Sequence, residues 1–162
     1  LDKDGLYGVG ASGSGNPAIY KKDNHISEAD LLLVYKLQAD AGDAASQFML
    51  GQSYYLGNSA TSINYKKAIY YLTKAAAQYP AQIELDGEDD EYKTMALAAS
   101  NAAGYLGIIY ARGEGVEANL DIARQWFERG VQQDNALSHT WLGRMYLRGI
   151  GVAKDYDKGM IC

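Results

Sequence analysis

Cysteine and long apolar runs are both scarce in this sequence. Its single cysteine, Cys162, excludes an internal disulfide and a metal site built from cysteines alone. The apolar runs are short, as in Leu31-Leu32-Leu33-Val34, whereas a helix that crosses a bilayer needs about 20 predominantly apolar residues. No segment of this sequence is therefore predicted to span a membrane.

Positive charge is in the minority. The chain has 15 Lys and Arg residues against 20 Asp and Glu residues, which gives a net charge of −5, and the basic residues do not cluster along the sequence. Binding to nucleic acid or to an anionic membrane needs a basic patch, because it proceeds by release of counterions. We therefore predict proteins or neutral ligands as partners, and no nucleic acid.

Histidine is also scarce, and the residue types that catalysis needs are scattered. His25 and His139 lie far apart, and neither has acidic or cysteine neighbours at the spacing of a metal site or a catalytic triad. Residues 8–13 read G-x-G-x-x-G, but they lack the preceding strand and the following helix of a dinucleotide site. We predict no catalytic residue, no metal and no cofactor, with nucleotide binding at residues 8–13 as an alternative.

A glycine-containing pattern recurs along the chain. The eleven residues that start at Leu106 match those that start at Leu142 at seven positions, an offset of 36 residues. An earlier copy starts at Leu50 and keeps Leu-Gly-x-x-Tyr-x-x-Gly, but it lies 56 residues upstream of the second copy, so an insertion of twenty residues separates them. Such a period indicates stacked helical repeats.

Each position of the pattern has a physical role in a pair of helices. Leu and Tyr four residues apart share one helix face, and the glycine beside the Leu lets a neighbouring helix approach closely. The second glycine ends the helix, and an Asn or Asp caps the next one. The expected terminators are Gly57, Gly113 and Gly149, the expected N-caps are Asn64, Asn119 and Asp155, and the tyrosines expected to be buried are Tyr54, Tyr110 and Tyr146.

The second helix of each pair carries a small residue followed by a bulky pair. Ala68-x-x-Tyr71-Leu72 and Ala123-x-x-Trp126-Phe127 show this pattern, whereas Gly159 replaces the alanine in the third copy. We predict that the bulky residues pack into the groove of the first helix. Residues 27–38 are interpreted as the second helix of a preceding pair, and the chain as a piece of a longer array.

The chain divides into a linker and a repeat domain. Residues 1–25 are rich in Gly and Ser and are predicted to be a flexible linker, and residues 26–162 are predicted to form the solenoid. The acidic insertion covers residues 79–92, and the helix after it is expected to begin near Asp90.

Three pairs of residues occupy equivalent places on the helix face opposite the Leu/Tyr stripe. Stacked units would align them into one surface ribbon that binds a partner, with arginines suited to acidic or carbonyl groups. Ordinary solvated arginines are an equally open interpretation. The pairs are Gln52 and Leu56, Ile108 and Arg112, and Arg144 and Arg148.

The pattern Leu-Gly-x-x-Tyr-x-x-Gly-x-Gly-Val, with the capping residue and the small-bulky set after it, resembles the Sel-one-like repeat (SLR) family. The resemblance covers residues 27–162 and is looser in the first copy, where Gly57-Asn58-Ser59-Ala60 departs from Gly-x-Gly-Val. It implies an all-α, right-handed α-solenoid of antiparallel helix pairs, similar to tetratricopeptide repeats, that serves as a non-catalytic protein-interaction scaffold.

Within that family, residues 27–52 and Trp126-Phe127-Glu128-Arg129-Gly130 resemble the luminal subunits of the endoplasmic-reticulum (ER) ubiquitin ligase, the Sel-one-L/Hrd-three group, in their fungal forms. This resemblance implies an adaptor of ER-associated degradation in the ER lumen, membrane-anchored in the full protein. Its implied partners are a membrane ubiquitin ligase, a luminal lectin and misfolded (glyco)proteins. The alternatives are a scaffold or activator of another complex, such as a cell-wall (chitin) synthase, a cytoplasmic location, and self-association through the incomplete C-terminal hairpin.

Overall fold

The computed structural model describes residues 26–79 and 90–162, and every regular element in these ranges is an α-helix. The predicted linker at 1–25, the G-x-G-x-x-G stretch and residues 80–89 of the acidic insertion lie outside the described residues. The helices are α2 (Glu28–Asp40), α3 (Ala44–Leu56), α4 (Tyr65–Ala77), α5 (Asp90–Arg112), α6 (Leu120–Gln132), α7 (Ala136–Arg148) and α8 (Tyr156–Ile161).

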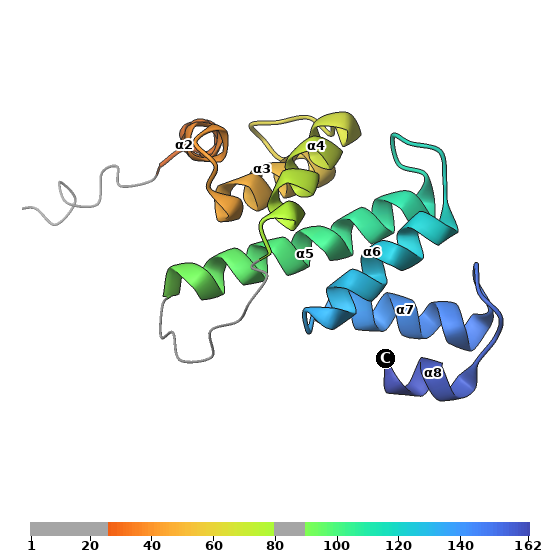
Figure 1. The fold of residues 1–162 in the computed structure, drawn as a ribbon. Helices are drawn as coiled ribbons and strands as arrows, with labels where there is room; N and C mark the ends of the chain where they lie inside the picture. Colours follow the sequence, from red (N-terminus) through yellow and green to blue (C-terminus); the bar gives the residue numbers. More distant parts are fainter. Residues whose placement is uncertain (1–25, 80–89) are drawn as a thin grey trace, which may run out of the picture.

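The helices form pairs that stack side by side, as predicted (Figure 1). We call the first helix of each pair an A helix (α3, α5 and α7) and the second a B helix (α4, α6 and α8). Helix α2 is a B helix that packs against α3. Each A helix contacts the B helix on either side of it in the sequence and also the next A helix. This is the arrangement of an α-solenoid.

The connection within each pair repeats one geometry. Each terminating glycine has a positive φ, at 71° for Gly57, 70° for Gly113 and 68° for Gly149, and such angles strain residues with a Cβ atom. Each predicted capping residue accepts a hydrogen bond from the amide three residues later, and its own amide donates to the carbonyl of the motif tyrosine at 2.8 to 3.0 Å. The terminators and N-caps are therefore confirmed.

The first connection has Ser59 in place of the second loop glycine, and the side chain of the preceding residue shapes the loop. Gly115 and Gly151 have positive φ in the later loops, whereas the first loop has Asn58, whose side-chain oxygen accepts hydrogen bonds from the amides of Ala60 at 3.0 Å and Thr61 at 2.8 Å. An Asx turn thus closes the loop where the family pattern uses glycine.

The A and B helices of a pair meet at the glycine beside the motif Leu. A Cβ atom on Gly51 would lie 2.8 Å from Cγ of Leu72, and one on Gly107 would overlap the ring of Phe127. Leu72 and Phe127 are fully buried, together with Ala68 and Ala123. The predicted packing of bulky B-helix residues against a glycine is therefore confirmed.

The motif tyrosines are half-buried, so their predicted burial in the core was wrong. Tyr54, Tyr110 and Tyr146 pack against the margin of the core. A tyrosine suits such a position, because its ring is apolar and its hydroxyl is polar. Burial is instead greater for Tyr55 and Tyr71.

The insertion lengthens the central A helix. Helix α5 has 23 residues and begins at Asp90, as expected, whereas α3 and α7 have 13 residues each. The extra residues are at its N-terminal end, because all three A helices end at the same place in the repeat.

Gly107→Ala tests the close approach. Alanine favours the helix by about 1 kcal/mol, but overpacking against a filled core costs about 1–3 kcal/mol, so we expect a net loss of unfolding free energy in urea. The double variant Gly107→Ala/Phe127→Leu should lose less than the sum of the two single changes, because a smaller side chain makes room for the methyl group. A stabilised Gly107→Ala variant would contradict this packing.

Candidate protein-interaction site

The structure places the predicted ribbon on the three A helices, which follow one another across the molecule (Figure 1). Leu56, Arg112, Arg144 and Arg148 are exposed and Gln52 is half-buried. Ile108 is 8% exposed and does not belong to the surface, which corrects the prediction. Helix α5 packs between the A helices α3 and α7. A repeat position that is exposed on α7 can therefore be buried on α5.

Gln52 connects the first two A helices. Its side-chain amide donates to the hydroxyl of Tyr105 at 2.7 Å. The ring of Tyr105 packs edge-on against Tyr55, with centroids 5.4 Å apart, and at 5.8 Å from Phe48. Gln52 therefore helps to hold α3 against α5.

Arg112 of α5 contacts both neighbouring A helices. Its Nη1 atom donates to the hydroxyl of Tyr55 on α3 at 3.3 Å and lies 3.7 Å from a carboxylate oxygen of Glu114. On the other side, the guanidinium lies 5.6 Å from the ring centre of Trp141 on α7. Burial of Tyr55 and its interaction with Glu114 raise the pKa of this tyrosine to about 12.

Trp141 is a candidate binding residue that the sequence analysis missed. Its ring stacks on Phe127 of α6 at 5.9 Å, and the guanidinium of Arg144 lies 5.8 Å from its centre. Guanidinium groups favour the faces of aromatic rings, which fix their orientation. The sequence feature that points to Trp141 is its position directly before the motif residue Leu142. That position places Trp141 on the helix face turned toward α6.

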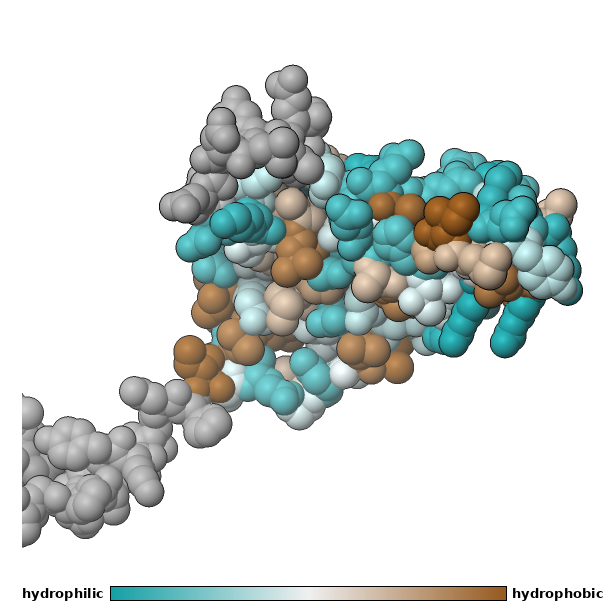
Figure 2. Space-filling view, turned by 90° about the horizontal axis from the view of Figure 1, so that it is seen from below, coloured by the Kyte–Doolittle hydropathy of each residue, from teal (hydrophilic) through white to brown (hydrophobic). Residues whose placement is uncertain are grey.

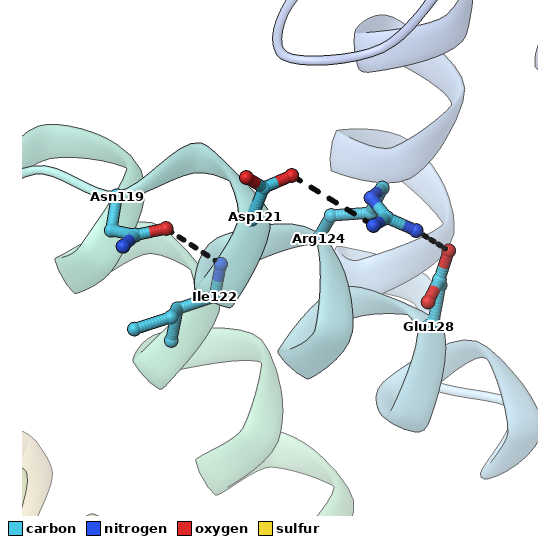
Figure 3. Close-up of polar contacts among 5 residues, drawn as sticks. All are labelled: Asn119, Asp121, Ile122, Arg124 and Glu128. Atoms are coloured by element: carbon cyan, nitrogen blue, oxygen red, sulfur yellow. Dashed lines mark hydrogen bonds and ion pairs between the residues drawn. The ribbon is translucent and has the colours of Figure 1, made fainter.

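The arginines differ in how far their charge is already balanced. Arg124 on α6 has Nη1 2.8 Å from Glu128 and Nη2 3.8 Å from Asp121, so two carboxylates flank it (Figure 3). Neither Arg144 nor Arg148 forms an ion pair with any described residue. These two charges are open to a partner. We call the set Arg112, Trp141, Arg144 and Arg148 the arginine surface.

Two other features, a metal-binding cluster and a membrane-spanning helix, are absent from the described ranges. Residues 26–79 and 90–162 contain no group of three His, Cys, Asp or Glu side chains placed to hold a metal ion. In the same ranges no helix is both long and apolar enough to cross a bilayer, and hydrophilic and hydrophobic residues are interspersed on the face shown in Figure 2. The arginine surface offers a partner the positive charges of its arginines beside the aromatic ring of Trp141.

Tyr55→Phe tests the contact between α3 and α5. We expect it to lower the free energy of unfolding by about 1 kcal/mol at neutral pH, because one buried hydrogen bond is lost. Tyr55 ionises at higher pH when folded than when unfolded, so the contribution of its hydroxyl is complete below about pH 10 and declines between pH 10 and 12. Urea unfolding at several pH values should show the difference shrinking in that window, whereas a difference that grows would contradict the assignment. The exposed Tyr156→Phe serves as a control.

Comparison with known proteins places these features in a family. The chain matches the Sel1 repeat over residues 44–79, 100–135 and 136–162, more than half of its length. It is 28% identical over 123 residues to the ERAD-associated E3 ubiquitin-protein ligase component HRD3B of Arabidopsis thaliana. That alignment covers 75% of this chain but spans only 16% of the relative's length.

A solved structure shows the same fold. The Sel1 repeat protein from Oxalobacter formigenes superposes with a TM-score of 0.64 over 80% of this chain and 84% of that chain, at 24% identity. The matched repeats begin at residues 44, 100 and 136, so the 36-residue offset between the second and third copies and the longer spacing after the first are confirmed. The chain belongs to the Sel1 repeat family, whose repeats form protein-interaction scaffolds.

Proposed function

We propose that this chain is part of an adaptor of ER-associated degradation, which holds a ubiquitin ligase and its substrates together without catalysing a reaction itself. The observation that supports this most is the similarity to HRD3B, a component of a ubiquitin ligase by its name. The proposed location is the ER lumen, with a membrane anchor elsewhere in the full protein. The proposed partners are a membrane ubiquitin ligase, a luminal lectin and misfolded proteins.

The arginine surface is the proposed contact for one of these partners. Arg144 and Arg148 are exposed and lie one helical turn apart on α7, and Trp141 orients the first of them. A planar guanidinium held in place loses little entropy when it binds a carboxylate with two hydrogen bonds. The surface thus suits a partner with acidic residues.

Cross-linked affinity purification of the full protein from its own cells, followed by mass spectrometry, tests the adaptor role. We expect a membrane-embedded RING ubiquitin ligase among the recovered proteins. Recovery of a cell-wall synthase without any ligase would contradict the adaptor role and leave the solenoid unaffected.

The same purification tests the arginine surface. Arg144→Gln/Arg148→Gln should lower recovery of the ligase complex by about tenfold, because central arginines contribute strongly to interfaces. Arg124→Gln is the matched control, since it removes an arginine whose charge is balanced within α6. Equal recovery with both variants would show that the arginine surface does not bind this complex.

A further inference from the structure

Four lysines gather around the groove between α2 and α4. Lys36 lies on α2, and Lys66, Lys67 and Lys74 lie on α4. This cluster is not visible in the sequence, because Lys36 is thirty residues from Lys66 and only the packing of both helices against α3 brings them together. The groove contains a cavity of about 350 Å³, lined by Lys36, Tyr54, Lys66, Lys67, Tyr70 and Tyr71.

Tyrosine rings form the floor of this groove. Tyr54 of α3 stacks on Tyr71 of α4 with centroids 6.0 Å apart, and Tyr70 meets Tyr71 edge-on at 5.0 Å. The ammonium of Lys67 lies 4.9 Å from the centre of the Tyr54 ring, and that of Lys74 lies 4.7 Å from the Tyr70 ring. Cation–π contacts therefore hold two of the lysines at the edge of the groove. Tyr70 is 53% exposed and offers a ring to a ligand.

The charge of the groove is not balanced. None of the four lysines forms an ion pair with a described residue. The carboxylate whose charge acts on Tyr71 and Lys74 is that of Asp40, at the end of α2. The groove therefore gathers four lysines without an ion-pair partner among the described residues, in a chain with a net charge of −5. An anionic ligand would restore the balance.

The shape of the groove decides between classes of anion. A flat bilayer would meet the exposed lysines but could not enter the cavity between the helices. A long nucleic-acid backbone would meet the negative charge of the rest of the chain. A narrow extended peptide with carboxylate side chains can enter between the helices, contact the rings and pair with the lysines. We propose that this lysine–tyrosine groove binds an acidic segment of a partner protein.

The proposal goes beyond the adaptor role and does not depend on it, because the groove is lined by residues of α2, α3 and α4 and by none of the residues of the arginine surface. A fluorescein-labelled peptide of eight glutamates, titrated with the purified chain and followed by fluorescence anisotropy, is the test. We expect saturable binding that weakens as salt is added and that is absent for a peptide of eight glutamines. Lys36→Gln/Lys67→Gln/Lys74→Gln should weaken binding about tenfold, the combined effect of three exposed charge contacts.

Two matched variants locate the binding. Lys154→Gln should leave affinity unchanged, because this lysine also lies over a tyrosine, 4.8 Å from the ring centre of Tyr156, but outside the groove. Arg124→Gln should likewise leave it unchanged, because two carboxylates of α6 already flank this guanidinium. Unchanged affinity in the lysine variant would overturn the proposal, and so would the absence of binding to the glutamate peptide. Tighter binding to phosphatidylserine vesicles or to duplex DNA than to the peptide would also overturn it.

Discussion

The close approach of the two helices in each pair is the constraint on which the rest of the structure depends. At Gly51 and Gly107 the A helix has no side chain, and Leu72 and Phe127 of the B helix fill the space. In the third pair, a Cβ atom on Gly143 would lie 3.1 Å from the backbone oxygen of Gly159, so these two helices also approach each other closely.

This approach fixes the position of the connecting loop. The amide of each capping residue reaches the carbonyl of the motif tyrosine only if the B helix starts beside the end of the A helix. The loop then needs left-handed backbone at its glycines, which a residue with a Cβ atom adopts at a cost. The spacing of glycine, tyrosine and cap in the sequence thus reflects one connected geometry.

Stacking of the pairs produces two surfaces with different chemistry. The A helices meet through Gln52, Tyr105 and the contacts of Arg112, and this leaves two arginines exposed beside Trp141. The packing of α2 and α4 against α3 instead gathers lysines over tyrosine rings. Guanidinium groups on a tryptophan suit directional pairing with carboxylates, whereas ammonium groups act as point charges. One acidic chain thus carries two local regions of positive charge.

The sequence predicted the fold better than it predicted the residues of the candidate binding sites. The position of Ile108 in the repeat placed it on the ribbon, but a position does not reveal whether another A helix covers it. Trp141 was missed because its partners, Phe127, Arg112 and Arg144, come from three different helices. The lysine cluster was missed for the same reason, since two of its contributing helices are separated along the chain.

The sequence by itself determined the helix pairs, their terminators and caps, and the glycine contacts, because these depend on backbone geometry and on interactions between neighbouring segments. The tertiary structure alone decided which repeat positions remain open to a partner and which charges remain unpaired. Burial and charge balance depend on side chains from helices distant in the sequence, and local spacing does not encode them.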